Sequence, residues 1–106
     1  MSLRVMAEYG SSGVWQNRKS KGLFRHGMVE LADLGLPPVL AARFAAWITT
    51  YEEDNLAGRL DVEKFNHEGR ALARELARVF GEVVEFQGEL EGGGLGPPEL
   101  IAPVSD

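Results

Sequence analysis

The sequence predicts an α+β domain in which two antiparallel helices pack on one face of a small, mainly antiparallel, three-stranded sheet. Two observations favour this fold class. Apolar and polar residues alternate in short segments near both ends of the first ninety residues, and two longer segments between them have helical periodicity. The length of 106 residues suits one domain. We expect that domain over residues 1–91, with a flexible Gly/Pro-rich tail over residues 92–106.

The first two strands are expected to form an N-terminal hairpin. Residues 3–9 alternate between apolar and polar side chains, as in a strand with one buried face, and Val5 and Tyr9 are expected on that face. Residues 10–13 (Gly-Ser-Ser-Gly) suit a tight turn, and residues 14–18 resume the alternation. Residues 19–29 lack a clear period and are expected to form a loop or a short extra strand, and residues 31–34 a single helical turn.

The first long helix is predicted over residues 37–54. Pro37 and Pro38 can open it, because the first helical turn leaves its amide hydrogens unpaired in any case. Its apolar stripe, at spacings of three and four, contains Leu40, Phe44, Trp47, Ile48 and Tyr51. The reverse face carries only small uncharged residues, namely Ala42, Ala45, Ala46 and Thr49. We therefore expect this helix to be packed on more than one side, within the fold or against a second copy.

The second long helix is predicted over residues 61–80, with Asp61 as its N-cap. Its apolar stripe includes Gly69, although glycine inside a helix costs about 1 kcal/mol relative to alanine. A close crossing against Trp47 or Phe44 would account for glycine at that position.

The third strand is predicted over residues 83–90, where alternation returns. The expected buried face contains Val84, Phe86 and Leu90, and the opposite face contains Glu85, Gln87 and Glu89. If this strand pairs with residues 3–9, Glu85 and Glu89 come close to Arg4. Such pairing would balance the charge of the chain, because residues 1–29 hold five basic groups against one acidic and residues 30–106 hold six against fifteen.

The composition excludes several classes of site. Without cysteine, disulfide frameworks and thiolate metal sites are absent, and the two histidines have no metal-ligand spacing, so we expect no metal and no cofactor. No apolar run approaches the roughly 18 residues of a membrane span, which favours a cytoplasmic protein without membrane contact. Nucleic-acid binding is disfavoured, because dedicated domains usually have a pI above about 9 and this chain has a pI near 5.0.

Two groups of residues are candidates for chemistry. The amides of the turn at residues 10–13, with the hydroxyls of Ser11 and Ser12, could bind an anion, although turn geometry alone explains these residue types. They offer a ligand-binding site only if nearby side chains converge on the turn.

The second group is Arg25 and His26 with Glu30. A carboxylate beside a histidine can orient it as a general base, so these three are the only catalytic candidates. A loop histidine is more often a surface residue that forms hydrogen bonds. The alternative hypothesis for this chain is thus a small anion-binding or hydrolytic enzyme that uses the turn together with Arg25 and His26.

Candidate partner-binding residues lie on the second helix. Arg70, Arg74 and Arg78 repeat every four residues and therefore share one helix face. A solvated helix face is the simple interpretation; a docking face for an acidic surface is the functional one, since arginine is favoured at interfaces. Trp15 is expected to cover the sheet or to contact a partner.

Two sequence segments resemble a family of small bacterial proteins of unknown function. They are Asp33-Leu34-Gly35-Leu36-Pro37-Pro38, followed by Leu40 to Phe44 and Trp47, and Phe65-Asn66-His67-Glu68-Gly69-Arg70-Ala71-Leu72-Ala73. The resemblance covers about residues 30–90. Proteins of this build are similar to immunity partners of bacterial toxins, which implies a protein partner and assigns no catalytic residue.

The leading hypothesis is therefore a non-enzymatic protein–protein interaction module, of the immunity-inhibitor type, with a protein partner. Because a three-stranded sheet leaves its edges open, we also expect a homodimer.

Overall fold

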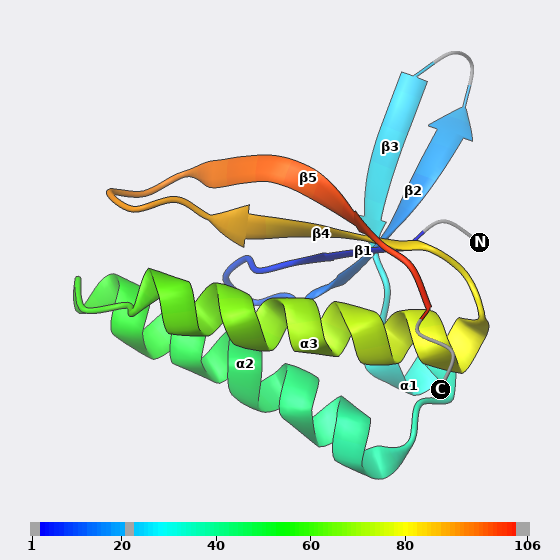
Figure 1. The fold of residues 1–106 in the computed structure, drawn as a ribbon, viewed down its shortest axis with the longest axis horizontal. Coiled ribbons are helices and arrows are strands. Elements are labelled where there is room, and N and C mark those ends of the chain that lie inside the picture. Colours follow the sequence, from blue (N-terminus) through cyan, green and yellow to red (C-terminus); the bar gives the residue numbers. More distant parts are fainter. Residues whose placement is uncertain (1–2, 21–22, 104–106) are drawn as a thin grey trace.

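The computed structural model describes residues 3–20 and 23–103, without the side chains of residues 17–20 and 23–26. Two long helices cover one face of a single sheet, which confirms the α+β class (Figure 1). In chain order the elements are β1 (Leu3–Met6), β2 (Val14–Ser20), β3 (Leu23–Met28), α1 (Leu31–Leu34), α2 (Pro38–Leu56), α3 (Val62–Phe80), β4 (Val84–Glu89) and β5 (Leu95–Ile101).

The sheet has five strands in the order β3-β2-β1-β4-β5, so the prediction of three strands is wrong. β1 and β4 run parallel and the other pairs are antiparallel. β3 falls in the segment expected to be a loop or a short strand. β5 falls in the predicted tail, where Pro97 and Pro98 argued against regular structure. An edge strand tolerates proline, because its outer side needs no amide for a ladder hydrogen bond.

Helix α2 buries one stripe and leaves the other face open. Its inner stripe of Leu40, Phe44, Trp47, Ile48 and Tyr51 is buried as predicted. Ala42, Ala45, Ala46 and Thr49 are exposed, so packing of α2 on more than one side is wrong for a single chain. No helix among the described residues is long and apolar enough to cross a membrane.

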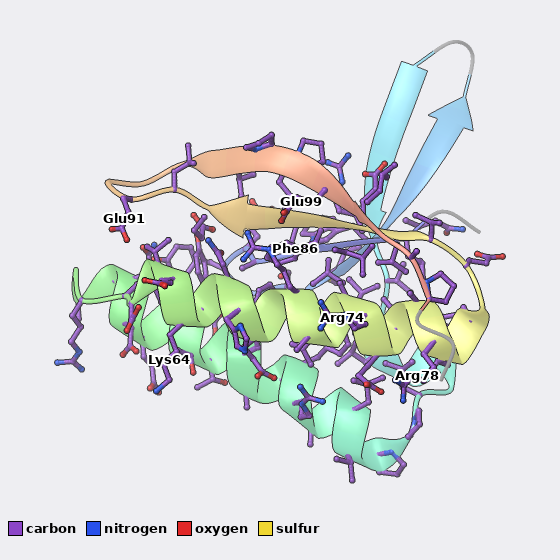
Figure 2. The ribbon with its side chains drawn as sticks, in the orientation of Figure 1. Lys64, Arg74, Arg78, Phe86, Glu91 and Glu99 are labelled. Carbon is purple, nitrogen blue, oxygen red and sulfur yellow. The ribbon has the colours of Figure 1, made fainter. Side chains whose placement is uncertain are left out.

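Helix α3 approaches the sheet most closely at Gly69. The Asp61 carboxylate accepts a hydrogen bond from the Lys64 amide at 3.1 Å, which confirms the predicted N-cap. A Cβ atom on Gly69 would lie 2.5 Å from the Phe86 ring and 2.7 Å from the Trp47 ring. The crossing against Trp47 is confirmed, and Phe86 of β4 is a second contact that the sequence did not predict (Figure 2).

The outer face of the sheet carries the predicted charge pairing. The Arg4 guanidinium donates to the Glu85 carboxylate at 2.8 Å and to the Gln87 side-chain oxygen at 3.0 Å. The parallel register places Arg4 directly beside Glu85. The expectation that Glu89 joins this group is wrong, because Glu89 lies on the helix side of the sheet and is buried.

A shift in strand register accounts for this reversal. The pairing of β4 with β5 is irregular between Gln87 and Glu89. Such irregularities turn side chains to the opposite face of a sheet. Glu89 is therefore buried at 9% exposure, whereas Leu90, predicted to be buried, is 47% exposed.

Replacing Gly69 by alanine tests the close approach of α3. Helix propensity alone predicts that Gly69→Ala stabilises the protein by about 1 kcal/mol. We expect net destabilisation of about 1–3 kcal/mol instead, because the added methyl group overlaps the rings of Phe86 and Trp47. Urea unfolding measures the difference. The double variant Gly69→Ala/Phe86→Leu should be less destabilised than the sum of the single variants, and strict additivity would contradict the contact.

Candidate functional site

Three connections of the chain meet at one end of the molecule (Figure 1). They are the turn between β1 and β2, the connection from the end of α2 to the start of α3, and the turn between β4 and β5. We call this the acidic end. Its carboxylates are those of Glu8, Glu52, Glu53, Asp54, Asp61, Glu63, Glu89 and Glu91.

Glu89 is held at the acidic end by its own backbone. The Glu89 amide donates to the Asn66 side-chain oxygen at 3.0 Å, and the Asn66 side-chain nitrogen donates to the Glu89 carbonyl at 2.9 Å. A Cβ atom on Gly88 would lie 2.7 Å from the Asn66 oxygen, so glycine makes room for this pair. The two hydrogen bonds fix the position at which β4 leaves its regular pairing.

The Glu89 side chain reaches the hydroxyl of Tyr51, which donates a hydrogen bond to it. The Tyr51 ring packs against Tyr9 at a centroid distance of 5.0 Å and against Phe65 at 5.6 Å. Phe65 in turn stacks on Trp47 at 4.5 Å. These aromatic contacts hold the phenol of Tyr51 in place.

Burial dominates the electrostatics of this pair. Loss of solvent raises the pKa of the Glu89 carboxyl group above its usual value, and the hydrogen bond from Tyr51 opposes that rise. Burial also raises the pKa of Tyr51, with a further contribution from the charge of Glu89. Tyr51 therefore stays protonated at neutral pH and acts as a donor.

Two more hydrogen bonds tie the turn between β1 and β2 to α2. The Gly10 amide donates to the Glu52 carboxylate at 2.7 Å, and the Asn55 side chain donates to the Tyr9 hydroxyl oxygen at 2.8 Å. Tyr9, expected on the inner face of the sheet, is 49% exposed beside this contact. The acidic end is thus a connected structure and not a set of independent loops.

Two hollows flank the acidic end. A groove of about 620 Å³ between α2 and α3 has Trp47 and Phe65 in its wall. Ion pairs cross it between Arg43 and Glu68 at 2.8 Å and between Arg59 and Asp54 at 3.7 Å. A smaller pocket of about 340 Å³ lies beside Glu89, between the α2–α3 connection and the β4–β5 turn. We call it the Glu89 pocket.

These hollows suit the binding of side chains. In the part of the chain that the structure describes, no group of three or more His, Asp or Glu residues could hold a metal ion.

Ser11 and Ser12 use their hydroxyl groups within the turn. The Ser11 hydroxyl donates to the Glu8 carbonyl at 2.8 Å, and the Ser12 hydroxyl donates to the Val29 carbonyl at 2.6 Å. Both residues border a hollow of about 340 Å³ that Glu30 also lines. The hydrogen bonds favour the turn interpretation, and anion binding stays a prediction.

Arg25 and His26 lie on β3, opposite Arg18 and Asn17 of β2. The hairpin of β2 and β3 projects away from the helices (Figure 1). The side chains of Arg25 and His26 are outside the described part of the structure, so their convergence with Glu30 stays a prediction.

The arginine row of α3 consists of Arg70, Arg74 and Arg78. Two of these side chains contact acidic residues, and the third is exposed to solvent (Figure 2). Arg70 pairs with Glu99 of β5 at 2.9 Å and lies 5.4 Å from the Phe86 ring centroid. Arg78 approaches Glu75 at 3.9 Å. Arg74 is exposed. Glu99 could not be foreseen as a partner, because it belongs to the segment predicted to be a tail.

Trp15 lies on the outer face of the sheet. Its register partners are Arg4 and Met28, and its indole nitrogen donates to the Met6 carbonyl at 3.0 Å. Trp15 thus covers the sheet, which was one of the two alternatives predicted for it. The other alternative, contact with a partner, stays a prediction.

Glu89 and Asn66 were not predicted as site residues, and Tyr51 was predicted only as a core residue. The signal was present in Gly88, because an isolated glycine in a strand pattern indicates an irregular pairing. An irregularity there reverses the face of the residue that follows.

Replacing Glu89 by glutamine tests the cost of its burial. When folding raises the pKa of a carboxyl group, the free energy of unfolding of the protein decreases as pH rises from the ordinary pKa of 4.5 through the pKa of the folded state. We therefore expect Glu89→Gln to unfold at higher urea concentration than the wild type at pH 7, with the difference shrinking as pH falls toward 4.5. A less stable variant at pH 7 would contradict the dominance of burial.

Comparison with known proteins places the chain in a family. No curated protein and no solved structure matches it. A family model described as Serratia CdiI immunity protein-like matches residues 1–87, which run from the N-terminus into β4. Because the match extends over most of the chain, this protein belongs to the Serratia CdiI immunity protein-like family.

Proposed function

We propose that this protein is an immunity-type inhibitor that binds and neutralises a protein toxin. The observation that carries the proposal is the family match over residues 1–87. The term immunity protein implies a toxin as partner and inhibition as the result. The proposal requires only a stable complementary surface, without a reaction on this chain.

The arrangement of polar groups supports a binding role. The hydroxyls of Ser11 and Ser12 donate to backbone carbonyls, and Arg4 and Arg70 are engaged with Glu85 and Glu99. Groups used in this way hold a rigid scaffold, and rigid surfaces bind with a smaller loss of conformational entropy. The alternative of a hydrolytic or anion-binding domain has less support, because its two serine hydroxyls already have acceptors.

Charge would contribute to the rate of binding. The chain has a formal net charge of −5, and the acidic end gathers eight carboxylates on neighbouring elements. Such a field increases the rate at which a basic partner associates and decreases that of an acidic one. The arginine row is the less favoured docking face, since Arg70 and Arg78 already contact acidic residues and Arg74 remains for a partner.

The test of this function is binding to the proteins encoded by the genes adjacent to this chain's gene, among which we expect the toxin. We expect a 1:1 complex with a dissociation constant of about 10 nM or lower by calorimetry, typical of specific protein complexes. Co-expression with that toxin should restore growth of cells that the toxin alone arrests. A toxin that neither binds nor is neutralised would overturn the proposal.

The homodimer is a separate proposal, for which the uncharged outer face of α2 is the available surface. Light scattering of the purified chain is expected to give twice the 11.6 kDa mass of one copy. Ala46→Arg should then give a monomer, because it places a charge in the middle of that face, whereas the exposed control Ala102→Arg should not. A wild-type mass of one copy would make the homodimer prediction wrong.

A further inference from the structure

The Glu89 pocket is lined by acidic and apolar residues together. Asn55 and Leu60 line it from the α2–α3 connection, and Leu90 and Glu91 line it from the β4–β5 side. Gly92 and Gly93 complete that side with positive φ angles of 87° and 105°. Glycine adopts this left-handed backbone conformation without strain, which accounts for both residues in the turn.

Glu89 is a buried acid without a cation. Its residue is 9% exposed. In the described chain, no basic side chain forms an ion pair with Glu89, whose polar side-chain contact is the Tyr51 hydroxyl. A carboxylate has about four acceptor positions, and one hydroxyl satisfies one of them. A buried charge without a counter-charge is unfavourable, so a cation entering the pocket would be stabilised.

The surroundings of the pocket have the same sign as Glu89. Glu91 stands at its rim, as Figure 2 shows at the β4–β5 turn. No basic residue is among the lining residues that the structure describes. Arg59 of the α2–α3 connection pairs with Asp54, and Lys64 of α3 lines the groove on the other side. Neither neutralises the carboxylate of Glu89.

The walls define what kind of cation fits. Leu60, Val62 and Leu90 offer apolar surface to the methylene groups of a long side chain while its charged end meets Glu89. Leu90, one of these apolar lining residues, is itself 47% exposed. Exposed apolar side chains around a polar pocket are typical of a protein–protein contact.

We propose that the Glu89 pocket receives a lysine or arginine side chain of the toxin, with the Glu89 carboxylate as its ion-pair partner and Glu91 at the rim. This inference rests on the proposed function for the identity of the partner. It goes beyond the family match, which ends at residue 87 and assigns no contact residue. The bound side chain would supply the counter-charge that Glu89 lacks within its own chain.

The first test measures binding of the toxin domain to Glu89→Gln. Glutamine keeps the shape of the side chain and an acceptor for Tyr51, and it removes the charge. We expect the affinity to fall at least tenfold, mainly through faster dissociation. Glu91→Gln should weaken binding by a smaller factor of about two to five and reduce its salt dependence, because its charge is exposed.

Asp33→Asn serves as the control, because Asp33 is an exposed acid on α1, outside the acidic end. It should leave the affinity within twofold of the wild type. Wild-type affinity for Glu89→Gln would overturn the pocket proposal while the inhibitor function stands.

A second test does not need the toxin. Butylammonium and ethylguanidinium ions, titrated into the isolated protein, should give saturable NMR shifts at Glu89, Gly92 and Gly93, and neutral butanol should not. The shifts should disappear in Glu89→Gln. If the toxin does not bind the wild type, the proposed function is wrong, and this titration alone tests whether the pocket binds a cation. Unshifted resonances in the wild type would overturn the pocket proposal.

Discussion

The close approach of α3 to the sheet at Gly69 is the contact on which the rest of the structure depends. With no side chain at this position, Phe86 of β4 and Trp47 of α2 meet over the helix backbone. Trp47 then stacks on Phe65 and donates from its indole nitrogen to the Phe65 carbonyl at 3.0 Å. One glycine thereby sets the separation of α2, α3 and β4, and the aromatic contacts that follow from it extend to Tyr51 and Glu89.

Periodicity predicted the parts of the fold that short-range physics determines. Helical spacing of apolar residues, the Asp61 cap and the alternation around Val5 and Phe86 each depend on neighbours in sequence, and each is confirmed. β5 could not be predicted in this way, because its proline-containing segment becomes a strand only by pairing with β4. The same pairing produces the register shift that buries Glu89, so β5 and the direction of the Glu89 side chain were missed for one reason.

The acidic residues on the two faces of the sheet have different partners. On the outer face, Glu85 meets Arg4 at 2.7 Å and the pair is neutral. On the helix side, Glu89 has a phenol in place of a cation, and its carboxylate borders a pocket. Stability would favour a leucine or a glutamine at position 89, since either removes a buried charge. Retaining a carboxylate there is understandable if binding uses the charge, because natural proteins often break local rules at functional sites.

A rigid setting makes such a charge effective. Asn66 fixes the Glu89 backbone through two hydrogen bonds, and Tyr51 is held between Tyr9 and Phe65. The carboxylate therefore has little freedom to lose when a partner binds, and its solvation has been partly removed during folding. An exposed acid such as Glu91 would lose both its conformational freedom and its solvation when a partner binds. The unfavourable burial of Glu89 in the free protein and its strength as a contact for a cation thus have the same physical origin.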